Sequence, residues 1–110
     1  MRGIGVDIEE ISRFSKHEYK NKKKLYEKIF SIDEINYCLN KHDPYPHFTA
    51  RFCAKEAVIK AIGNKKINLK DIEVVLVDSK PIIKSSHVKT CFVSLSHTKT
   101  HAIAFVIVID

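Results

Sequence analysis

The sequence predicts an α+β fold in which an antiparallel sheet packs on a long central helix. Three observations lead to this class. An alternating segment opens the chain, helical spacing of apolar residues follows in the first half, and β-branched runs dominate the second half. With 110 residues and 45% hydrophobic content, the chain is long enough for one hydrophobic core and too short for two. We therefore expect a single domain over residues 1–110.

The opening segment, residues 3–9, alternates apolar residues with small or acidic ones, which is typical of a strand with one buried face. We expect Ile4, Val6 and Ile8 to point into the core. The opposite face carries two glycines beside Asp7, and the missing side chains leave room for a group to approach the Asp7 carboxylate closely.

A block of basic residues lies between Arg13 and Lys28, and the net charge of +6 is concentrated there. Ser12 is placed to cap a short helix through this block. The apolar residues that this helix and its continuation carry inward are Phe14, Leu25, Ile29 and Phe30. Such a block attracts a polyanion, which is nucleic acid, a membrane surface or an acidic protein. A solvated basic face explains the charges equally well.

A second helix is expected to begin at Ser31, because Ser31 and Glu34 form a capping box. We expect it to end near Lys41, before Pro44 and Pro46 break the chain.

The central helix is expected from about His47 to Ile62, and Gly63 is placed to end it. Its apolar residues fall on two sides, so both sides should be covered by other elements. One side carries Phe48, Phe52, Ile59 and Ile62, and the other carries Ala54, Ala57, Val58 and Ala61. The narrow face that remains carries Thr49, Cys53, Glu56 and Lys60.

The second half of the chain is expected to form antiparallel strands, which the opening strand joins. We expect these strands at residues 72–77, 82–83, 90–95 and 102–109. The last is almost wholly apolar, so both of its faces should be covered, one by the central helix and the other by a second subunit.

Two acidic residues far apart in the chain, Asp7 and Glu56, lie in segments whose apolar pattern demands burial. A carboxylate held there is costly unless a cation accompanies it. Oxygen ligands suit magnesium, which takes one or two carboxylates together with waters and substrate phosphates. Lys60, one turn from Glu56, is then placed to offset charge on a transferred phosphoryl group. The alternatives are a silent surface ion pair between Glu56 and Lys60 and replacement of Asp7 by Glu9 as a metal ligand.

Polar donors also gather at residues 93–102, between two apolar strands. They are Ser94, Ser96, His97, Thr98 and Lys99. Hydroxyl, imidazole and ammonium donors suit an anionic phosphate, although the pattern alone slightly favours an ordinary polar hairpin turn. His97 and His101 are four residues apart, but a strand and turn do not make this spacing a zinc pair.

The ordered motifs of the chain resemble those of the holo-[acyl-carrier-protein] synthases, a family of small 4′-phosphopantetheinyl transferases. These motifs are Gly3-Ile-Gly-Val-Asp7 followed by Arg13, Phe30-Ser-x-x-Glu34, Arg51-Phe-x-Ala-Lys-Glu-Ala-x-x-Lys-Ala61 and Val93-Ser-x-Ser-His97. The resemblance implies a 4′-phosphopantetheinyl transferase-like fold and a homotrimer with each active site between neighbouring subunits.

The resemblance also implies an activity for fatty acid biosynthesis. It implies transfer of 4′-phosphopantetheine from coenzyme A to a serine of apo-acyl carrier protein, with release of adenosine 3′,5′-bisphosphate. It implies magnesium bound by Asp7 and Glu56, and Lys60 in contact with the pyrophosphate. Arg51 and His97 would lie near the coenzyme A phosphates. Glu56, directly or through a metal-bound water, is our hypothesis for the base that takes the serine proton.

The expected protein partner is the acidic carrier protein, contacted by Arg13 and the lysines that follow it, with neither nucleic acid nor a membrane as partner. Two alternatives stay open: a basic nucleic-acid-binding module, and a magnesium-dependent phosphohydrolase that uses the same acids with water. The odd set of three cysteines predicts reduced thiols in a cytoplasmic protein. Ser79 stands where the family commonly has glycine, which questions the geometry of that turn.

Overall fold

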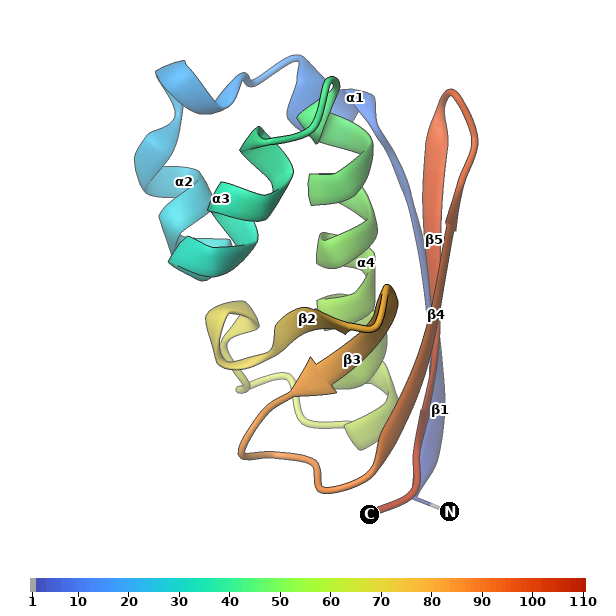
Figure 1. Cartoon of the computed structure of the whole chain (residues 1–110). Coiled ribbons are helices and arrows are strands. Elements are labelled where there is room, and N and C mark those ends of the chain that lie inside the picture. Colours follow the sequence, from blue (N-terminus) through green and yellow to red (C-terminus); the bar gives the residue numbers. More distant parts are fainter. Residues whose placement is uncertain (1) are drawn as a thin grey trace.

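One long helix, α4 (Pro44–Ile62), runs along the middle of the molecule, and a three-stranded antiparallel sheet covers one of its sides (Figure 1). The computed structural model describes residues 2–110. The strands lie in the order β1 (Gly3–Glu10), β5 (His101–Val108) and β4 (Cys91–His97). This architecture confirms the predicted α+β class.

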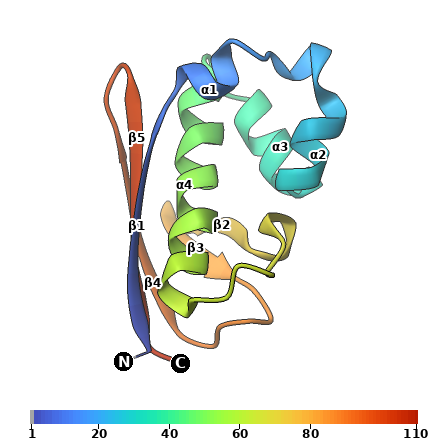
Figure 2. The same cartoon turned by 180° about the vertical axis from the view of Figure 1, so that it is seen from behind.

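The remaining elements cover the other sides of α4, as the view from behind shows (Figure 2). Beside its N-terminal half lie α1 (Ser12–Ser15), the 3₁₀ turn η1 (Tyr19–Asn21), α2 (Lys23–Ile29) and α3 (Ile32–Leu39). Beside its C-terminal half lie η2 (Leu69–Asp71), β2 (Glu73–Val77) and β3 (Lys80–Lys84). The strands β2 and β3 pair only with each other, so they form a separate hairpin instead of extending the sheet.

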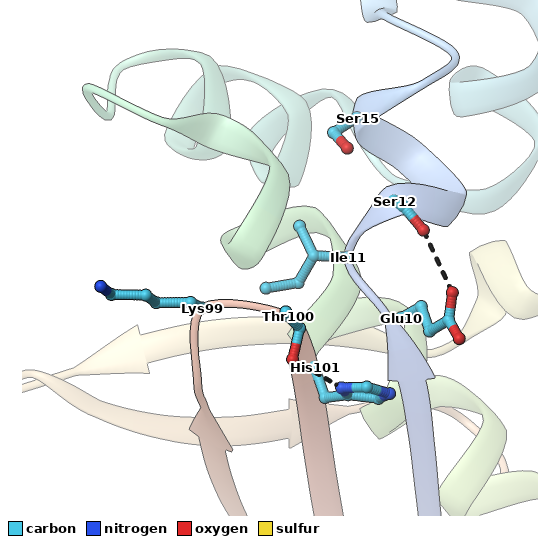
Figure 3. A pocket seen from close by; sticks show the side chains of 7 residues that line it. All are labelled: Glu10, Ile11, Ser12, Ser15, Lys99, Thr100 and His101. Atoms are coloured by element: carbon cyan, nitrogen blue, oxygen red, sulfur yellow. Dashed lines mark hydrogen bonds between the residues drawn. The ribbon is translucent and has the colours of Figure 1, made fainter.

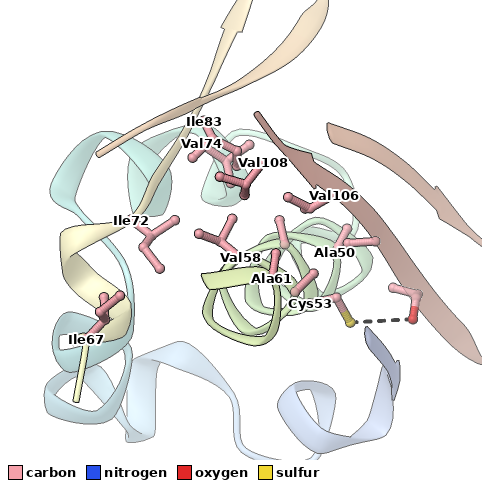
Figure 4. Close-up of a cluster of buried hydrophobic side chains, with 14 residues drawn as sticks. Ala50, Cys53, Val58, Ala61, Ile67, Ile72, Val74, Ile83, Val106 and Val108 are labelled. Atoms are coloured by element: carbon pink, nitrogen blue, oxygen red, sulfur yellow. Dashed lines mark hydrogen bonds between the residues drawn. The ribbon is translucent and has the colours of Figure 1, made fainter. Parts of the chain in front are cut away.

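Two clusters of buried side chains hold these elements on α4. The larger one is aliphatic and joins α4 to the sheet and the hairpin, with Val58, Val74 and Val106 among its members (Figure 4). The second is aromatic and lies beneath α1, α2 and α3, where the rings of Tyr26 and Phe48 meet edge to face with centroids 4.8 Å apart. Because α4 contributes to both clusters, it is covered on nearly all sides.

The starts of the helices differ in part from the prediction. The prolines do not break the chain, because α4 begins at Pro44 and both prolines lie in its first turn, where backbone N–H groups need no helical partner. Asp43 caps this end by accepting from the Tyr45 amide at 3.2 Å. Ser12 is not a cap but the first residue of the four-residue α1, and Leu25 is 45% exposed instead of buried. The capping box of α3 is confirmed.

The orientation of β1 is opposite to the prediction. Ile4, Val6 and Ile8 lie on the outer face of the sheet and are 57%, 49% and 61% exposed. The glycine side faces α4, and a Cβ on Gly5 would lie only 1.9 Å from the Ala57 carbonyl oxygen. The group that the glycines allow to approach is therefore the backbone of α4 itself.

The outer face of the sheet is apolar and uncovered in the single chain. The inner face of β5 is buried against α4, as predicted for one side of this strand. On the outer face the large exposed side chains are Ile4, Val6, Ile8, Phe92, Ile103 and Phe105. An apolar patch of this kind marks a contact surface.

The turn between β2 and β3 keeps its geometry without glycine. Asp78 and Ser79 have φ angles of 53° and 65°, the positive values at both central residues that a type I′ hairpin turn requires. Ser79 thus adopts the conformation that glycine takes most easily. Within residues 2–110, no helix is both long and apolar enough to cross a membrane.

Candidate functional site

The predicted acidic residue of β1 lies over the middle of α4. Gly3 sits against Ala61 and Gly5 against Ala57, so two residues of strand advance by one helical turn. Asp7 consequently lies over the next turn, at Cys53. The pKa of the Cys53 thiol is raised to about 12, first by burial and then by the Asp7 carboxylate, with further contributions from Glu9 and Glu56. Of the three carboxylates, that of Asp7 affects the thiol most.

Lys60 joins this group from α4. Its Nζ donates to Asp7 Oδ1 at 3.0 Å and to the Val6 carbonyl oxygen at 3.0 Å. The Asp7 side chain is 16% exposed and that of Lys60 is 55% exposed, so the ammonium reaches the carboxylate from the solvent side. Glu56 lies one turn before Lys60 and is half-buried. The structure thus joins Asp7 to Lys60 and places Glu56 one helical turn away on α4; we name Asp7, Glu56 and Lys60 the acidic half-site.

Two of the four residues on the narrow face of α4 lie inside the protein. Thr49 and Cys53 are fully buried, because β1 and β5 pack directly on this side of the helix. Only Glu56 and Lys60, further along the same face, reach the surface.

The atoms of the acidic half-site that can bind a metal ion are the carboxylate oxygens of Asp7 and Glu56. Arg13 binds the Glu9 carboxylate at 2.7 Å and Lys60 binds that of Asp7 at 3.0 Å, so a cation at Asp7 and Glu56 would take the place of the Lys60 ammonium. Among residues 2–110 no three His, Cys, Asp or Glu side chains gather into a preformed cage. Two carboxylates that leave other positions to water and phosphate are the ligand set that magnesium uses. The residues therefore fit magnesium arriving with a phosphate substrate better than a permanently caged ion.

A second group of site residues lies near His97, which ends β4. The ring of His97 lies 6.1 Å from that of His47 on α4. Burial lowers the pKa of His47, and the nearby Arg51, Lys41 and His97 lower it further, whereas Asp43 raises it. These cationic and imidazole groups make this end of α4 attractive to an anion; we name Arg51, His47 and His97 the basic half-site.

Arg51 is the most informative member of this basic half-site. It is 4% exposed, its guanidinium stacks on the Tyr37 ring at 4.2 Å, and its Nη1 donates weakly to the His47 carbonyl oxygen at 3.4 Å. Its Nε finds no hydrogen-bond partner in the described part of the chain. Arg51 and Tyr37 line a hollow whose other wall is β2. A buried guanidinium without a carboxylate partner is suited to bind an anionic ligand.

The two half-sites lie at opposite edges of the sheet. Asp7 belongs to the edge strand β1 and His97 to the edge strand β4, with β5 between them. Two strand spacings separate these edges by about 10 Å. Arg51 and Lys60 are nine positions apart on α4, which is about 13 Å along its axis. The structure therefore brings together each half of the predicted site but does not join the halves within one chain.

Arg13 lies at the border of the acidic half-site. Its guanidinium pairs with Glu9 and lies over the Phe52 ring at 4.6 Å. A separate hollow opens at the end of β1 and β5, where Ser12 donates to Glu10 and Thr100 bonds to His101 (Figure 3). None of the predicted site residues lines this second hollow.

Sequence reasoning missed the buried pair of Lys55 and Glu34. Lys55 Nζ lies 2.8 Å from Glu34 Oε1, and both side chains are fully buried. The signal was present, because Lys55 falls at helical spacing within the apolar stripe of Phe48, Phe52 and Ile59. A lysine within such a stripe indicates a buried cation, which requires a partner.

Comparison with known proteins identifies the family. The model of the 4′-phosphopantetheinyl transferase superfamily matches residues 3–106. The chain belongs to this superfamily. Within the superfamily, the holo-[acyl-carrier-protein] synthase of Thermodesulfovibrio yellowstonii is 41% identical to the chain, and the match covers 98% of both proteins. The resemblance seen in the motifs is thereby confirmed.

Solved structures of this transferase superfamily share the fold. The holo-[acyl-carrier-protein] synthase of Bacillus anthracis, in complex with CoA (3′,5′-ADP), is 34% identical with a TM-score of 0.85. The match covers 97% of this chain and 95% of the Bacillus anthracis chain. The Helicobacter pylori synthase, in complex with coenzyme A, is 31% identical with a TM-score of 0.83. The match covers 96% of this chain and 98% of the Helicobacter pylori chain. These relatives give no support to a nucleic-acid-binding module or a phosphohydrolase.

Proposed function

We propose that this protein is a holo-[acyl-carrier-protein] synthase. It transfers 4′-phosphopantetheine from coenzyme A to a serine of apo-acyl carrier protein, for fatty acid biosynthesis, and releases adenosine 3′,5′-bisphosphate. The observation that carries the proposal is the bond between Lys60 and Asp7, which joins the carboxylate of β1 to the part of α4 that carries Glu56. Relatives that are named for this activity, and two that were solved with coenzyme A or its nucleotide, support it.

The reaction is a displacement at phosphorus. The serine oxygen bonds to the β-phosphorus of coenzyme A, and the bond from this phosphorus to the bridging oxygen breaks, so that adenosine bisphosphate leaves with the electron pair. Glu56, directly or through water, takes the serine proton. Lys60, whose side chain is 55% exposed, would move from Asp7 to the pyrophosphate and offset its charge.

Asp7 and Glu56 would hold a magnesium ion. When bound, such an ion neutralises phosphate oxygens during transfer. In the free protein Lys60 compensates the charge of the half-buried Asp7 instead. Arg51 and His97 would bind the phosphates of the nucleotide, including the 3′-phosphate, because the Arg51 Nε has no hydrogen-bond partner among residues 2–110 and its Nη1 donates only at 3.4 Å.

A complete site is proposed to form between two chains of a homotrimer. The acidic half-site at the β1 edge of one chain would meet the basic half-site at the β4 edge of its neighbour, because the two lie at opposite edges of the sheet within one chain. Head-to-tail contacts close into a ring of three when each contact rotates the next chain by one third of a turn. The apolar outer face of the sheet, with Phe105 at 44% exposure, would be buried in the assembly.

The carrier protein would dock on the basic helices of the first third of the chain. Arg13 is held beside the acidic half-site by Glu9 and Phe52. Further lysines, on η1 and α2, extend the positive surface away from it. An acidic partner steered to this surface would present its serine near Glu56.

The proposal is tested by incubating the protein with apo-carrier protein, coenzyme A and magnesium. Mass spectrometry should detect a phosphopantetheine adduct on the carrier serine. Glu56→Gln keeps the side-chain volume but removes the charge, so transfer should be lost while the fold remains. Asp71→Asn, an exposed charge on η2, is the matched control and should transfer normally. Release of adenosine bisphosphate without carrier protein would instead indicate a phosphohydrolase.

A further inference from the structure

A fully buried ion pair joins the elements that surround α4. Lys55 Nζ donates to Glu34 Oε1 at 2.8 Å, to the Leu69 carbonyl oxygen at 3.1 Å and to the Ile72 carbonyl oxygen. The other carboxylate oxygen of Glu34 accepts from the Val74 amide at 2.9 Å. The pair therefore ties α4 to α3, to η2 and to β2.

Stability alone gives a weak reason for such a pair. Burying two charges costs desolvation free energy that their attraction repays only with good geometry, and apolar residues of similar volume serve as well. The contacts of Lys55 are nevertheless fixed by three acceptors on two separate elements. A lysine bound in this way restrains the rotation of its helix about the helix axis.

The pair lies behind both half-sites. Lys55 directly precedes Glu56, and consecutive residues of a helix point about 100° apart. Anchoring Lys55 toward α3 and η2 consequently turns Glu56 toward the β1 side. Glu34 lines the same hollow as Arg51 and holds its other wall, β2, through the Val74 amide.

We propose that the Lys55–Glu34 pair positions the active-site residues. It sets the rotation of α4 that presents Glu56 to Asp7, and it holds β2 against the hollow of Arg51. The inference rests on the proposed function, and both residues act through others without touching the reacting atoms.

Two variants separate the effect of the pair on the rotation of α4 from its effect on the position of β2. Lys55→Met removes the ammonium but leaves Glu34 bonded to the Val74 amide, so kcat per folded protein should fall about 10- to 100-fold with a small change in the KM for coenzyme A. Glu34→Gln offers one oxygen where the carboxylate accepts with two, so the Val74 contact weakens as well. This variant should lower kcat and also raise the KM for coenzyme A.

A second readout does not depend on turnover. Cys53 is fully buried behind the acidic half-site, so rotation of α4 should expose it. Alkylation of Cys53, followed by peptide mass mapping below the unfolding temperature, should be at least several-fold faster in Lys55→Met than in the wild type. Ile67→Ala, a cavity variant in the aliphatic cluster, is the control for lost stability alone and should keep both kcat and Cys53 protection.

The outcomes distinguish the two proposals. Absence of transfer by the wild type would refute the proposed function. Normal transfer by the wild type, together with unchanged kcat and unchanged Cys53 protection in folded Lys55→Met, would refute the positioning role alone. If Lys55→Met does not fold, Glu34→Gln decides. Unchanged kcat and KM in this variant would overturn the proposal, and a lower kcat together with a higher KM for coenzyme A would support it.

Discussion

Replacing Gly5 by alanine tests whether the contact between β1 and α4 sets the geometry of the acidic half-site. A Cβ on Gly5 would lie 1.9 Å from the carbonyl oxygen of Ala57 and 2.8 Å from its carbonyl carbon. Real Cβ contacts below 3.0 Å are essentially absent, so strand and helix must separate by about 1.1 Å, the difference between 3.0 and 1.9 Å. Both obstructing atoms belong to the backbone, so no rotamer change relieves the clash.

The separation would act directly on the site, because Asp7 lies two residues along β1 and Glu56 is the neighbour of Ala57. We expect the free energy of unfolding to fall by about 3 kcal/mol from overpacking. A misplacement of about 1 Å should lower kcat about 100-fold. Urea unfolding followed by circular dichroism measures the first quantity, and the rate of holo-carrier formation, measured by mass spectrometry on folded protein, gives the second.

Gly63→Ala is the matched control at the end of the same helix. Gly63 has a φ of 80°, and apart from Gly63 itself and its two chain neighbours no described residue lies within 4 Å of the position of its Cβ. Alanine there should cost about 1–2 kcal/mol of left-handed strain while leaving β1 in place, so kcat should be retained. Wild-type stability and kcat in Gly5→Ala, or an equal loss of kcat in both variants, would refute the argument.

Three further predictions concern the surfaces and the thiols. Phe105→Glu should place a charge on the outer face of the sheet and dissociate the proposed trimer, with loss of transfer; a trimer of the variant in light scattering after gel filtration would contradict this. Glutamates in place of the three lysines at 22–24 should raise the KM for carrier protein about tenfold but not that for coenzyme A; an equal change in both would assign the lysines another role. Burial raises the pKa of Cys53 from 9.0 to about 12. Its contribution to the free energy of unfolding is therefore fully present below pH 9 and should be lost as pH rises toward 12, which urea unfolding of the wild type and Cys53→Ala at several pH values would show.

Periodicity predicted the elements better than their orientation. The strand expected over 102–109 is observed at His101–Val108, and the capping box starts α3 as predicted. In β1, alternation sets the period of two but not which side meets the helix. The glycine side was interpreted as open, yet close packing on a helix backbone requires residues without side chains. The isoleucines then face outward, where only other chains can cover them.

The buried charge of the central helix could not be predicted from the sequence for a related reason. Because α4 is covered on nearly all sides, its sequence has no broad polar face from which to infer its rotation. Glu56 is half-buried, in keeping with the prediction of a partly buried carboxylate, but the fully buried charge of the helix is Lys55, which was not predicted. Its partner Glu34 was recognised only as a cap. The long-range pairing depends on how α3 is placed against α4, which local sequence patterns do not encode.

The position of the half-sites at opposite edges of the sheet has a consequence for mixed populations of chains. In the proposed trimer, a chain damaged at Asp7 still lends an intact His97 to its neighbour, and a chain damaged at His97 still lends an intact Asp7. If subunits assort at random from equal amounts of the two inactive proteins, about one interface in four receives two sound halves. Mixing the two inactive variants would thus restore part of the activity. In a cell, two differently mutated copies of the gene would complement each other.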